Sequence, residues 1–136
     1  MATLVDSNVL LDVMTLDRKW FEWSSNALAN AADSGRLIIN PVIYAEISIR
    51  FSTIEALEDA LPDNMFDRDP IPFAAAFLAG KVFMSYRKRS GIKRSPLPDF
   101  FIGAHAALAG HTLLTRDAKR YRSYFSNLDL ITPTRA

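Results

Sequence analysis

Four acidic side chains lie in separate parts of the sequence that a folded chain could bring together. They are Asp6, Glu46, Asp99 and Asp117, here called the four acids, and each lies beside or within an apolar stretch. Carboxylates that crowd together repel one another, and a bound cation relieves the repulsion. The chain has no cysteine, so the ligands of such a site are oxygen atoms, which suit Mg²⁺ or Mn²⁺. Divalent ions of this kind activate water and stabilise a leaving oxygen when phosphodiesters are cleaved.

Each of the four acids also has an ordinary structural interpretation. Asp6 and Asp99 are residue types that cap helix N-termini, and Asp117 is a common turn residue. Glu46 lies in an apolar helical segment, where Arg50, one turn further on, could pair with it. The hypothesis of a shared site therefore depends on where the fold places all four acids, and not on any one of them.

The spacing of apolar residues, prolines and glycines predicts strands that alternate with helices. A helix from about residue 100 to 109, capped by Asp99 and stopped by Gly110, is one example. We expect strands at residues 3–5, 37–39, 112–114 and 128–131, a weaker one between Phe66 and Ile71, and helices at about 20–32, 53–61 and 73–90 and from residues 9 and 41 onward.

This alternation predicts an α/β fold in three layers, with helices on both faces of a central parallel sheet of four to five strands. In open sheets of this kind the ligand crevice lies outside the carboxyl ends of the strands. Asp6 and Asp117 each follow a predicted strand, Asp99 opens the helix before one, and Glu46 lies near the start of the helix after another. We therefore expect the four acids at one edge of the sheet.

Length and composition set limits on the kind of protein. The 136 residues suit a single domain over residues 1–136, and 49% hydrophobic with 23% charged residues is ordinary for a globular domain. A net charge of +1 requires a local basic patch if the partner is a nucleic acid. Residues 1–14 lack the basic start of a signal peptide, and no apolar run approaches the roughly 20 residues that span a bilayer, so we expect a cytoplasmic protein with no membrane partner.

Four segments resemble, in the family order, the four sequence blocks of PIN-domain nucleases, and they look most like VapC-type toxins of type II toxin–antitoxin systems. The segments are LVDSNVL at residues 4–10, PVIYAEI at 41–47, LPDFFIGAHA at 97–106 and LLTRD at 113–117. Together they extend over nearly the whole chain. The resemblance implies a PIN-like fold, RNA cleavage with Mg²⁺ or Mn²⁺, a homodimer, and a cognate antitoxin protein that blocks the active site.

The resemblance also implies roles for individual residues. The four acids would form the catalytic, metal-binding cluster, and Asn8 and Thr115 would orient the ligating carboxylates and bound water. Ser7 occupies a position where Thr is commoner in the family, and it retains the hydroxyl group. Some members carry another acid shortly after the last of the four, whereas this chain has Ala118, Lys119 and Arg120. A second metal ion is therefore expected to bind only together with substrate.

An RNA substrate requires phosphate contacts from Lys and Arg. Arg87, Lys93 and Arg94 belong to the densest basic run, and Arg116 adjoins Asp117 in a second one. We expect these four residues to bind the substrate, with Arg116 steadying a phosphate or the charge that develops during cleavage. For the first run the alternative is a solvated helix end, where cations favour the helix dipole.

Aromatic and histidine residues have competing interpretations. Trp20, Phe21 and Trp23 could stack on unpaired bases, although their helical spacing favours core or dimer contacts. His105 or His111 could act as a general base, but metal-activated water needs no histidine, which favours structural roles for both.

The hypothesis favoured by the sequence is a metal-dependent endoribonuclease that leaves a 5′-phosphate and a 3′-hydroxyl. One alternative is an aspartate-dependent phosphatase with Asp6 as nucleophile, although Asn8 occupies the position where that chemistry usually has a second acid. Another is a non-catalytic module of the same fold that binds RNA or protein.

Overall fold

Five parallel strands form the centre of the molecule. The structure, a computed structural model, describes residues 2–89 and 97–133. Lys93 and Arg94 therefore lie outside the described residues. The strands are β1 (Ala2–Val5), β2 (Arg36–Ile39), β3 (Phe66–Arg68), β4 (Thr112–Leu114) and β5 (Leu130–Ile131), in the spatial order β3-β2-β1-β4-β5. The helices are α1 (Ser7–Met14), α2 (Phe21–Ser34), α3 (Pro41–Ser48), α4 (Ile54–Ala60), α5 (Phe73–Arg89), α6 (Pro98–Ala109) and α7 (Ala118–Tyr124).

The strand order brings distant segments of the chain together. β1 is central and pairs in parallel with β2 on one side and β4 on the other. In its register Leu4 lies opposite Leu113 and Val5 opposite Leu114, so β1 and β4 end side by side. The residues that follow these strands, Asp6 and Thr115, must therefore lie at the same edge of the sheet.

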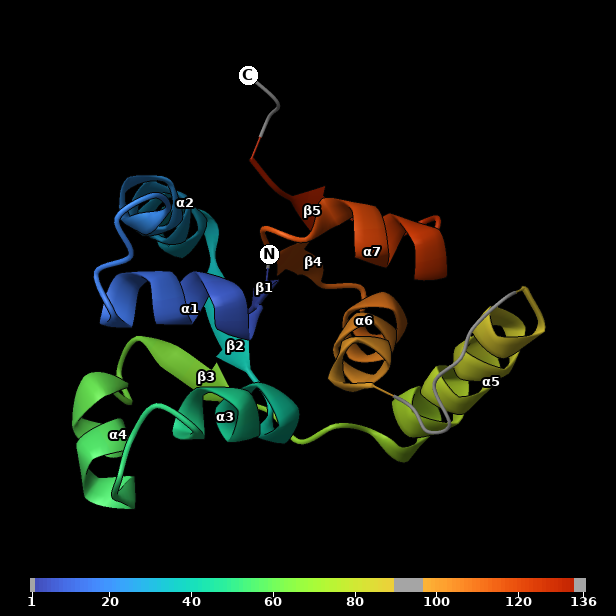
Figure 1. Cartoon of the computed structure of the whole chain (residues 1–136), viewed down its shortest axis with the longest axis horizontal. Coiled ribbons are helices and arrows are strands. Elements are labelled where there is room, and N and C mark those ends of the chain that lie inside the picture. Colours follow the sequence, from blue (N-terminus) through green and yellow to red (C-terminus); the bar gives the residue numbers. More distant parts are fainter. Residues whose placement is uncertain (1, 90–96, 134–136) are drawn as a thin grey trace.

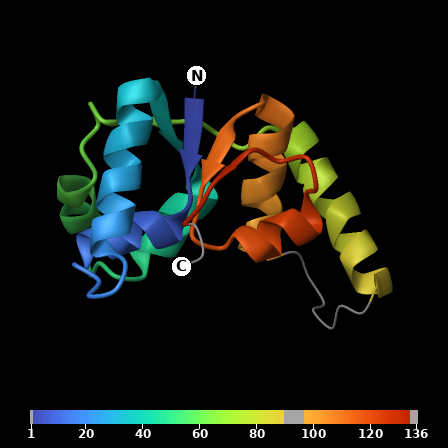
Figure 2. The same cartoon turned by 90° about the horizontal axis from the view of Figure 1, so that it is seen from above.

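Helices cover both faces of the sheet, which confirms the expected three-layer α/β arrangement. α1 and α2 lie on one side, and α5, α6 and α7 lie on the other (Figures 1 and 2). Strands β1, β2 and β4 are buried apart from the first residue of each, as expected for a sheet covered on both faces. α5 packs against α6 and extends away from the sheet (Figure 1).

Most predicted elements are present, with shifted ends. The weak strand near Phe66 exists as β3, and the last strand is shorter than expected, at Leu130–Ile131. One prediction is wrong: Asp99 does not cap α6, because that helix already begins at Pro98 with Leu97 in the N-cap position. Proline suits the first turn of a helix because the missing N–H there has no helical partner in any case. Within the described ranges, no helix combines the length and apolar character needed to span a membrane.

Candidate active site

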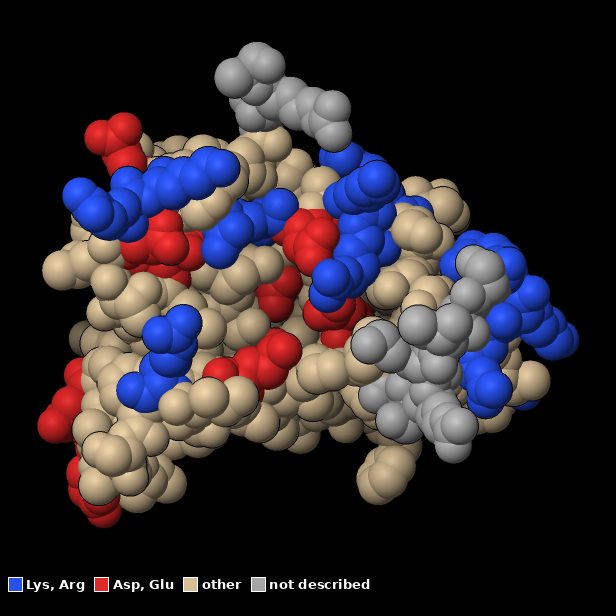
Figure 3. Space-filling view, viewed as in Figure 1, with Lys and Arg blue, Asp and Glu red and all other residues tan. Residues whose placement is uncertain are grey.

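The carboxyl edge of the sheet gathers the four acids from four elements. Asp6 joins β1 to α1, and Glu46 lies on α3 after β2. Asp99 is in the first turn of α6, and Asp117 lies between β4 and α7. Seen from this edge, acidic atoms lie near the middle of the surface with basic side chains around them (Figure 3).

Asp6 is the most buried of the four acids, and donors surround its carboxylate. It takes the N-cap position of α1, where Oδ1 accepts from the backbone N–H of Ser7 at 2.7 Å. Oδ2 accepts from the Thr115 hydroxyl at 2.7 Å and from the Asn8 amide at 3.4 Å. Burial raises the pKa of Asp6 to about 6, with Asp99 and Glu46 adding to the rise, although the Thr115 hydrogen bond opposes it. A bound cation would stabilise the ionised form of a buried carboxylate this close to other acids.

Glu46 is fixed by a serine and not by an arginine. The Ser7 hydroxyl donates to Glu46 Oε1 at 2.7 Å and links α1 to α3. The alternative of an ion pair with Arg50 is wrong: among the described residues no ion pair joins Glu46 to Arg50, which lies in an exposed turn after the end of α3. Burial raises the pKa of Glu46, the Ser7 hydrogen bond lowers it, and the charge of Asp99 raises it. The charge of Asp99 thus raises the pKa of both Asp6 and Glu46.

Asp99 and Asp117 are connected by one arginine. Arg120 Nη1 donates to Asp99 Oδ2 at 2.6 Å, and Arg120 Nε lies 3.3 Å from Asp117 Oδ2. The other oxygen of Asp99 accepts from the Tyr121 hydroxyl at 3.3 Å. Asp117 occupies the N-cap position of α7, but its side chain makes no capping hydrogen bond. Helix capping therefore does not account for the presence of Asp99 or Asp117 at these positions.

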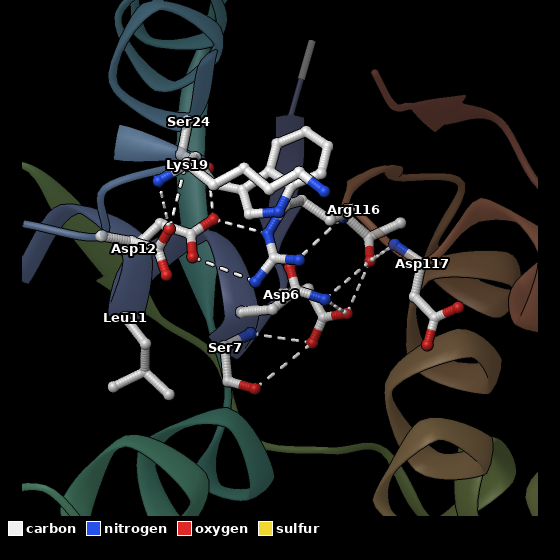
Figure 4. A network of polar contacts seen from close by, with 12 residues as sticks. Asp6, Ser7, Leu11, Asp12, Lys19, Ser24, Arg116 and Asp117 are labelled. Carbon is white, nitrogen blue, oxygen red and sulfur yellow. Dashed lines mark hydrogen bonds and ion pairs between the residues drawn. The ribbon is translucent and has the colours of Figure 1, made fainter. Parts of the chain in front are cut away.

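Asn8 and Thr115 form a small polar network around Asp6. The Asn8 amide donates to Thr115 Oγ1 at 3.3 Å, and Asn8 Oδ1 accepts from the backbone of Arg116 at 3.2 Å. Thr115 Oγ1 also accepts from the backbone N–H of Asp117 at 3.0 Å. Figure 4 shows Asp6 at the centre of these contacts, with the Asp117 carboxylate pointing away from it. The network joins the ends of β1 and β4 and holds the Asp6 carboxylate in one orientation.

The four acids are spaced more widely than a closed metal cage. In the parts of the chain that the structure describes, only Asp69, His105 and His111 bring three donor atoms within 4.8 Å of one another. Carboxylates at wider spacing suit Mg²⁺, which keeps several water molecules and takes few protein ligands. The donor set fits this ion in its chemistry, since it consists of hard oxygen atoms around a carboxylate whose pKa is raised.

The histidine cluster is less suited to a cation. Asn40 caps α3 through its Oδ1, which accepts from Ile43 N at 2.9 Å. This fixes the amide, so its Nδ2 donates to His105 Nδ1 at 3.0 Å and leaves the hydrogen of the neutral ring on Nε2. Burial lowers the pKa of His105, followed by the effect of His111. A protonated nitrogen is not a metal ligand, and the geometry gives His105 a structural role.

Arg116 lies beside the site with its guanidinium already engaged. Its Nε and Nη2 donate to the two oxygens of Asp12 at 2.6 and 3.0 Å, and Asp12 also accepts from Ser24 Oγ at 2.6 Å (Figure 4). The Trp20 ring lies 5.0 Å from the guanidinium carbon. Contact between Arg116 and an RNA phosphate stays a prediction, and it would have to use guanidinium N–H groups other than the two that donate to Asp12.

The other expected phosphate contacts lie further from the acids. Arg87 is exposed in the last turn of α5, with its guanidinium carbon 5.9 Å from the Phe83 ring. α5 ends well to one side of the sheet edge (Figure 1). Arg87 could reach only a part of a long substrate that is remote from the four acids.

Several residues of the site were not singled out from the sequence. Ser7 was noted only for its hydroxyl, and Tyr121 donates to an acid 22 positions earlier, which no local pattern reveals. The contact of Arg120 with Asp117 could have been predicted, because residues three positions apart at the start of a helix lie on the same side of it. Asp12 was missed because its partner, Arg116, is 104 positions away.

The fold and the site together define a class of α/β protein with a group of acids at the carboxyl edge of a parallel sheet. The sequence matches the family model described as PIN domain over residues 3–125. The chain therefore belongs to the PIN domain family. No curated protein matches the sequence significantly.

Solved structures share this fold at low sequence identity. The structure of VapBC2 from Rickettsia felis bound to a promoter DNA fragment matches with a TM-score of 0.74 and 18% identity over 97% of this chain and 98% of that chain. The structure of VapBC-1 from nontypeable Haemophilus influenzae matches with a TM-score of 0.73 and 17% identity over 97% of this chain and 98% of that chain. A toxin–antitoxin complex from Klebsiella pneumoniae matches with a TM-score of 0.69 and 22% identity over 98% of this chain and 99% of that chain. At such identities the likeness establishes the fold.

Proposed function

We propose that this chain is a Mg²⁺- or Mn²⁺-dependent endoribonuclease and the toxin of a type II toxin–antitoxin pair. The observation that carries the proposal is the gathering of Asp6, Glu46, Asp99 and Asp117 at one edge of the sheet, with Asp6 buried beside two of the others. Membership of the PIN domain family supports nuclease chemistry, and the toxin–antitoxin complexes among the similar structures support the biological setting.

The four acids are the residues that would hold the divalent ion. When bound, such an ion lowers the pKa of water and neutralises charge on the scissile phosphate. Thr115, Asn8 and the Ser7 backbone orient the Asp6 carboxylate through the hydrogen bonds described above. The Ser7 hydroxyl does the same for Glu46, so one helix start positions two acids. Attack on phosphorus by water would leave a 5′-phosphate and a 3′-hydroxyl.

The partners follow from the same proposal. An antitoxin chain is supported by the complexes that share the fold. A homodimer is supported by the apolar side of α5, where Phe73 is 96% and Phe77 68% exposed. Exposed aromatic side chains of this extent commonly mark a protein contact.

The test is cleavage of RNA by the purified chain with Mg²⁺ or Mn²⁺ and with EDTA. Asp6→Asn and Asp99→Asn should each lower the rate by at least about a hundredfold. Asp33→Asn, at an exposed site on α2, is the matched control and should leave the rate unchanged. Circular dichroism confirms that all variants fold.

The outcomes separate the competing functions. A folded Asp6→Asn variant with normal activity would overturn the assignment of the site. RNA binding without cleavage under any metal would favour the non-catalytic module. Cleavage that persists in EDTA and leaves cyclic phosphates would exclude metal-activated water. Sequencing the RNA ends identifies the target.

A further inference from the structure

Arg120 lies between two of the four acids. Its Nη1 is 2.6 Å from Asp99 Oδ2 and its Nε is 3.3 Å from Asp117 Oδ2, so a single guanidinium joins α6 to the start of α7. The Asp99 side chain is only 14% exposed, whereas Arg120 is 49% exposed. The acid is thus fixed in the fold, and the arginine reaches it from the surface.

A guanidinium and a divalent cation cannot share these oxygens without a cost. Both neutralise the same carboxylates, and their positive charges repel at short range. An arginine cannot leave by losing its proton, because a guanidinium stays protonated in proteins, and the hydrogen bond to Asp99 raises the pKa of Arg120 further. A cation that binds these same oxygens, Oδ2 of Asp99 and Oδ2 of Asp117, must therefore displace the Arg120 side chain.

The surroundings of Arg120 allow this movement. With half of its side chain in solvent, it can rotate outward without opening the core. Asp99 would stay in place, because the Tyr121 hydroxyl donates to its other oxygen at 3.3 Å and Tyr121 is fully buried. The acid would therefore keep its orientation after the arginine has left.

We propose that Arg120 is an internal counter-ion that competes with the divalent cation for Asp99 and Asp117 and that moves outward when the cation binds. The inference rests on the proposed function, in that it takes the four acids as the cation site. It predicts that Arg120 weakens cation binding, because part of the binding free energy is used to displace it. Pairs that are partly exposed to solvent are weak, so the effect should be modest, about three- to tenfold in affinity.

Calorimetric titration with Mn²⁺ in the absence of RNA tests the proposal. Arg120→Gln should bind Mn²⁺ about three- to tenfold more tightly than the original chain. Arg120→Lys keeps the charge and loses the two-pronged geometry. Its affinity for Mn²⁺ should lie between those of the original chain and Arg120→Gln. Arg122→Gln is the matched control: it removes the same charge from an exposed site on the same helix and should change the affinity less than twofold.

Several results would overturn the proposal. Equal gains in Arg120→Gln and Arg122→Gln would show a general charge effect, and weaker binding in Arg120→Gln would make Arg120 a supporting group. In either case Mn²⁺ binding that is lost in Asp6→Asn would leave the proposed function standing. If neither the original chain nor Arg120→Gln binds Mn²⁺, the metal site and the competition fail together.

Discussion

Asp6 shows how one buried carboxylate links the stability of the fold to the charge of the site. Its side chain is 3% exposed and meets donors on both oxygens, yet burial and two neighbouring acids raise its pKa to about 6. An acid whose pKa rises on folding stabilises the folded state in its protonated form. Ionisation of Asp6 therefore destabilises the folded state, and a bound cation would offset this destabilisation.

We expect the stability of the metal-free protein to fall with rising pH because of Asp6. Its pKa is about 3.8 when unfolded and about 6 when folded, so its contribution is fully present below about pH 4 and is lost as pH rises through 6. The whole change is about 3 kcal/mol. About half of this change falls between pH 5 and pH 8, and urea unfolding in EDTA at these two pH values measures that part. Comparison with Asp6→Asn separates the contribution of Asp6 from those of the other groups. A difference between the two proteins that does not vary with pH would contradict this account.

At the scale of elements, the packing of α6 against the end of α7 depends on a position without a side chain. Gly103 lies in the buried middle of α6, and a Cβ added there would lie 2.6 Å from Cδ2 of Phe125. Phe125 follows α7 and is only 7% exposed, so it has little room to move. Because Asp99 and Arg120 lie on these two helices, their packing also sets the geometry of the site.

We expect Gly103→Ala to lower the free energy of unfolding by about 1–3 kcal/mol through overpacking. Gly80→Ala is the matched control, because nothing lies within 4 Å of its Cβ position in α5. There alanine should stabilise by about 0.5–1 kcal/mol through its better helix propensity. Chemical denaturation of both variants decides the matter, and equal effects at the two positions would refute the packing argument.

The elements were largely predictable from the sequence because the signals that define them are local. Runs such as residues 37–39 alternate with helical spacing, and Pro41 marks the start of α3. The error at Asp99 has the same origin, because both Pro98 and Asp99 are residue types found at helix starts. Which of them begins the helix depends on the backbone path before α6, and local residue types do not determine that path. The sequence placed all four acids at one edge because parallel strands fix that edge.

The partners of the acids were not predictable in the same way. Glu46 could be given a local partner, Arg50, but the fold supplies Ser7 from 39 positions away. Such contacts depend on strand order and helix orientation, which a single sequence does not determine. Partners that lie close in the sequence are the exceptions: Asn8 is two positions after Asp6, and Arg120 is three positions after Asp117.

At the scale of the whole molecule, charge and apolar surface are divided between two regions. The net charge is only +1, but acidic atoms gather near the middle of one face and basic side chains border them (Figure 3). Exposed apolar side chains lie on several elements, and three of them, Phe73, Phe77 and Met84, lie on α5. This helix extends from the body of the protein (Figure 1). This division separates a site for cation and phosphate from a surface suited to contact with another chain.

The apolar side of α5 gives the last prediction. Phe73, Phe77 and Met84 are spaced by four and seven residues, so they share one helix face, and they are 96%, 68% and 49% exposed. If this face forms the homodimer, Phe77→Ser should convert a dimer to a monomer in light scattering coupled to size-exclusion chromatography. Ile49→Ser is the control, because Ile49 is 82% exposed at the end of α3. A monomeric original chain would contradict the homodimer. A dimer that survives Phe77→Ser would place the contact elsewhere, since burying that ring should contribute about 1.5–3 kcal/mol per protomer.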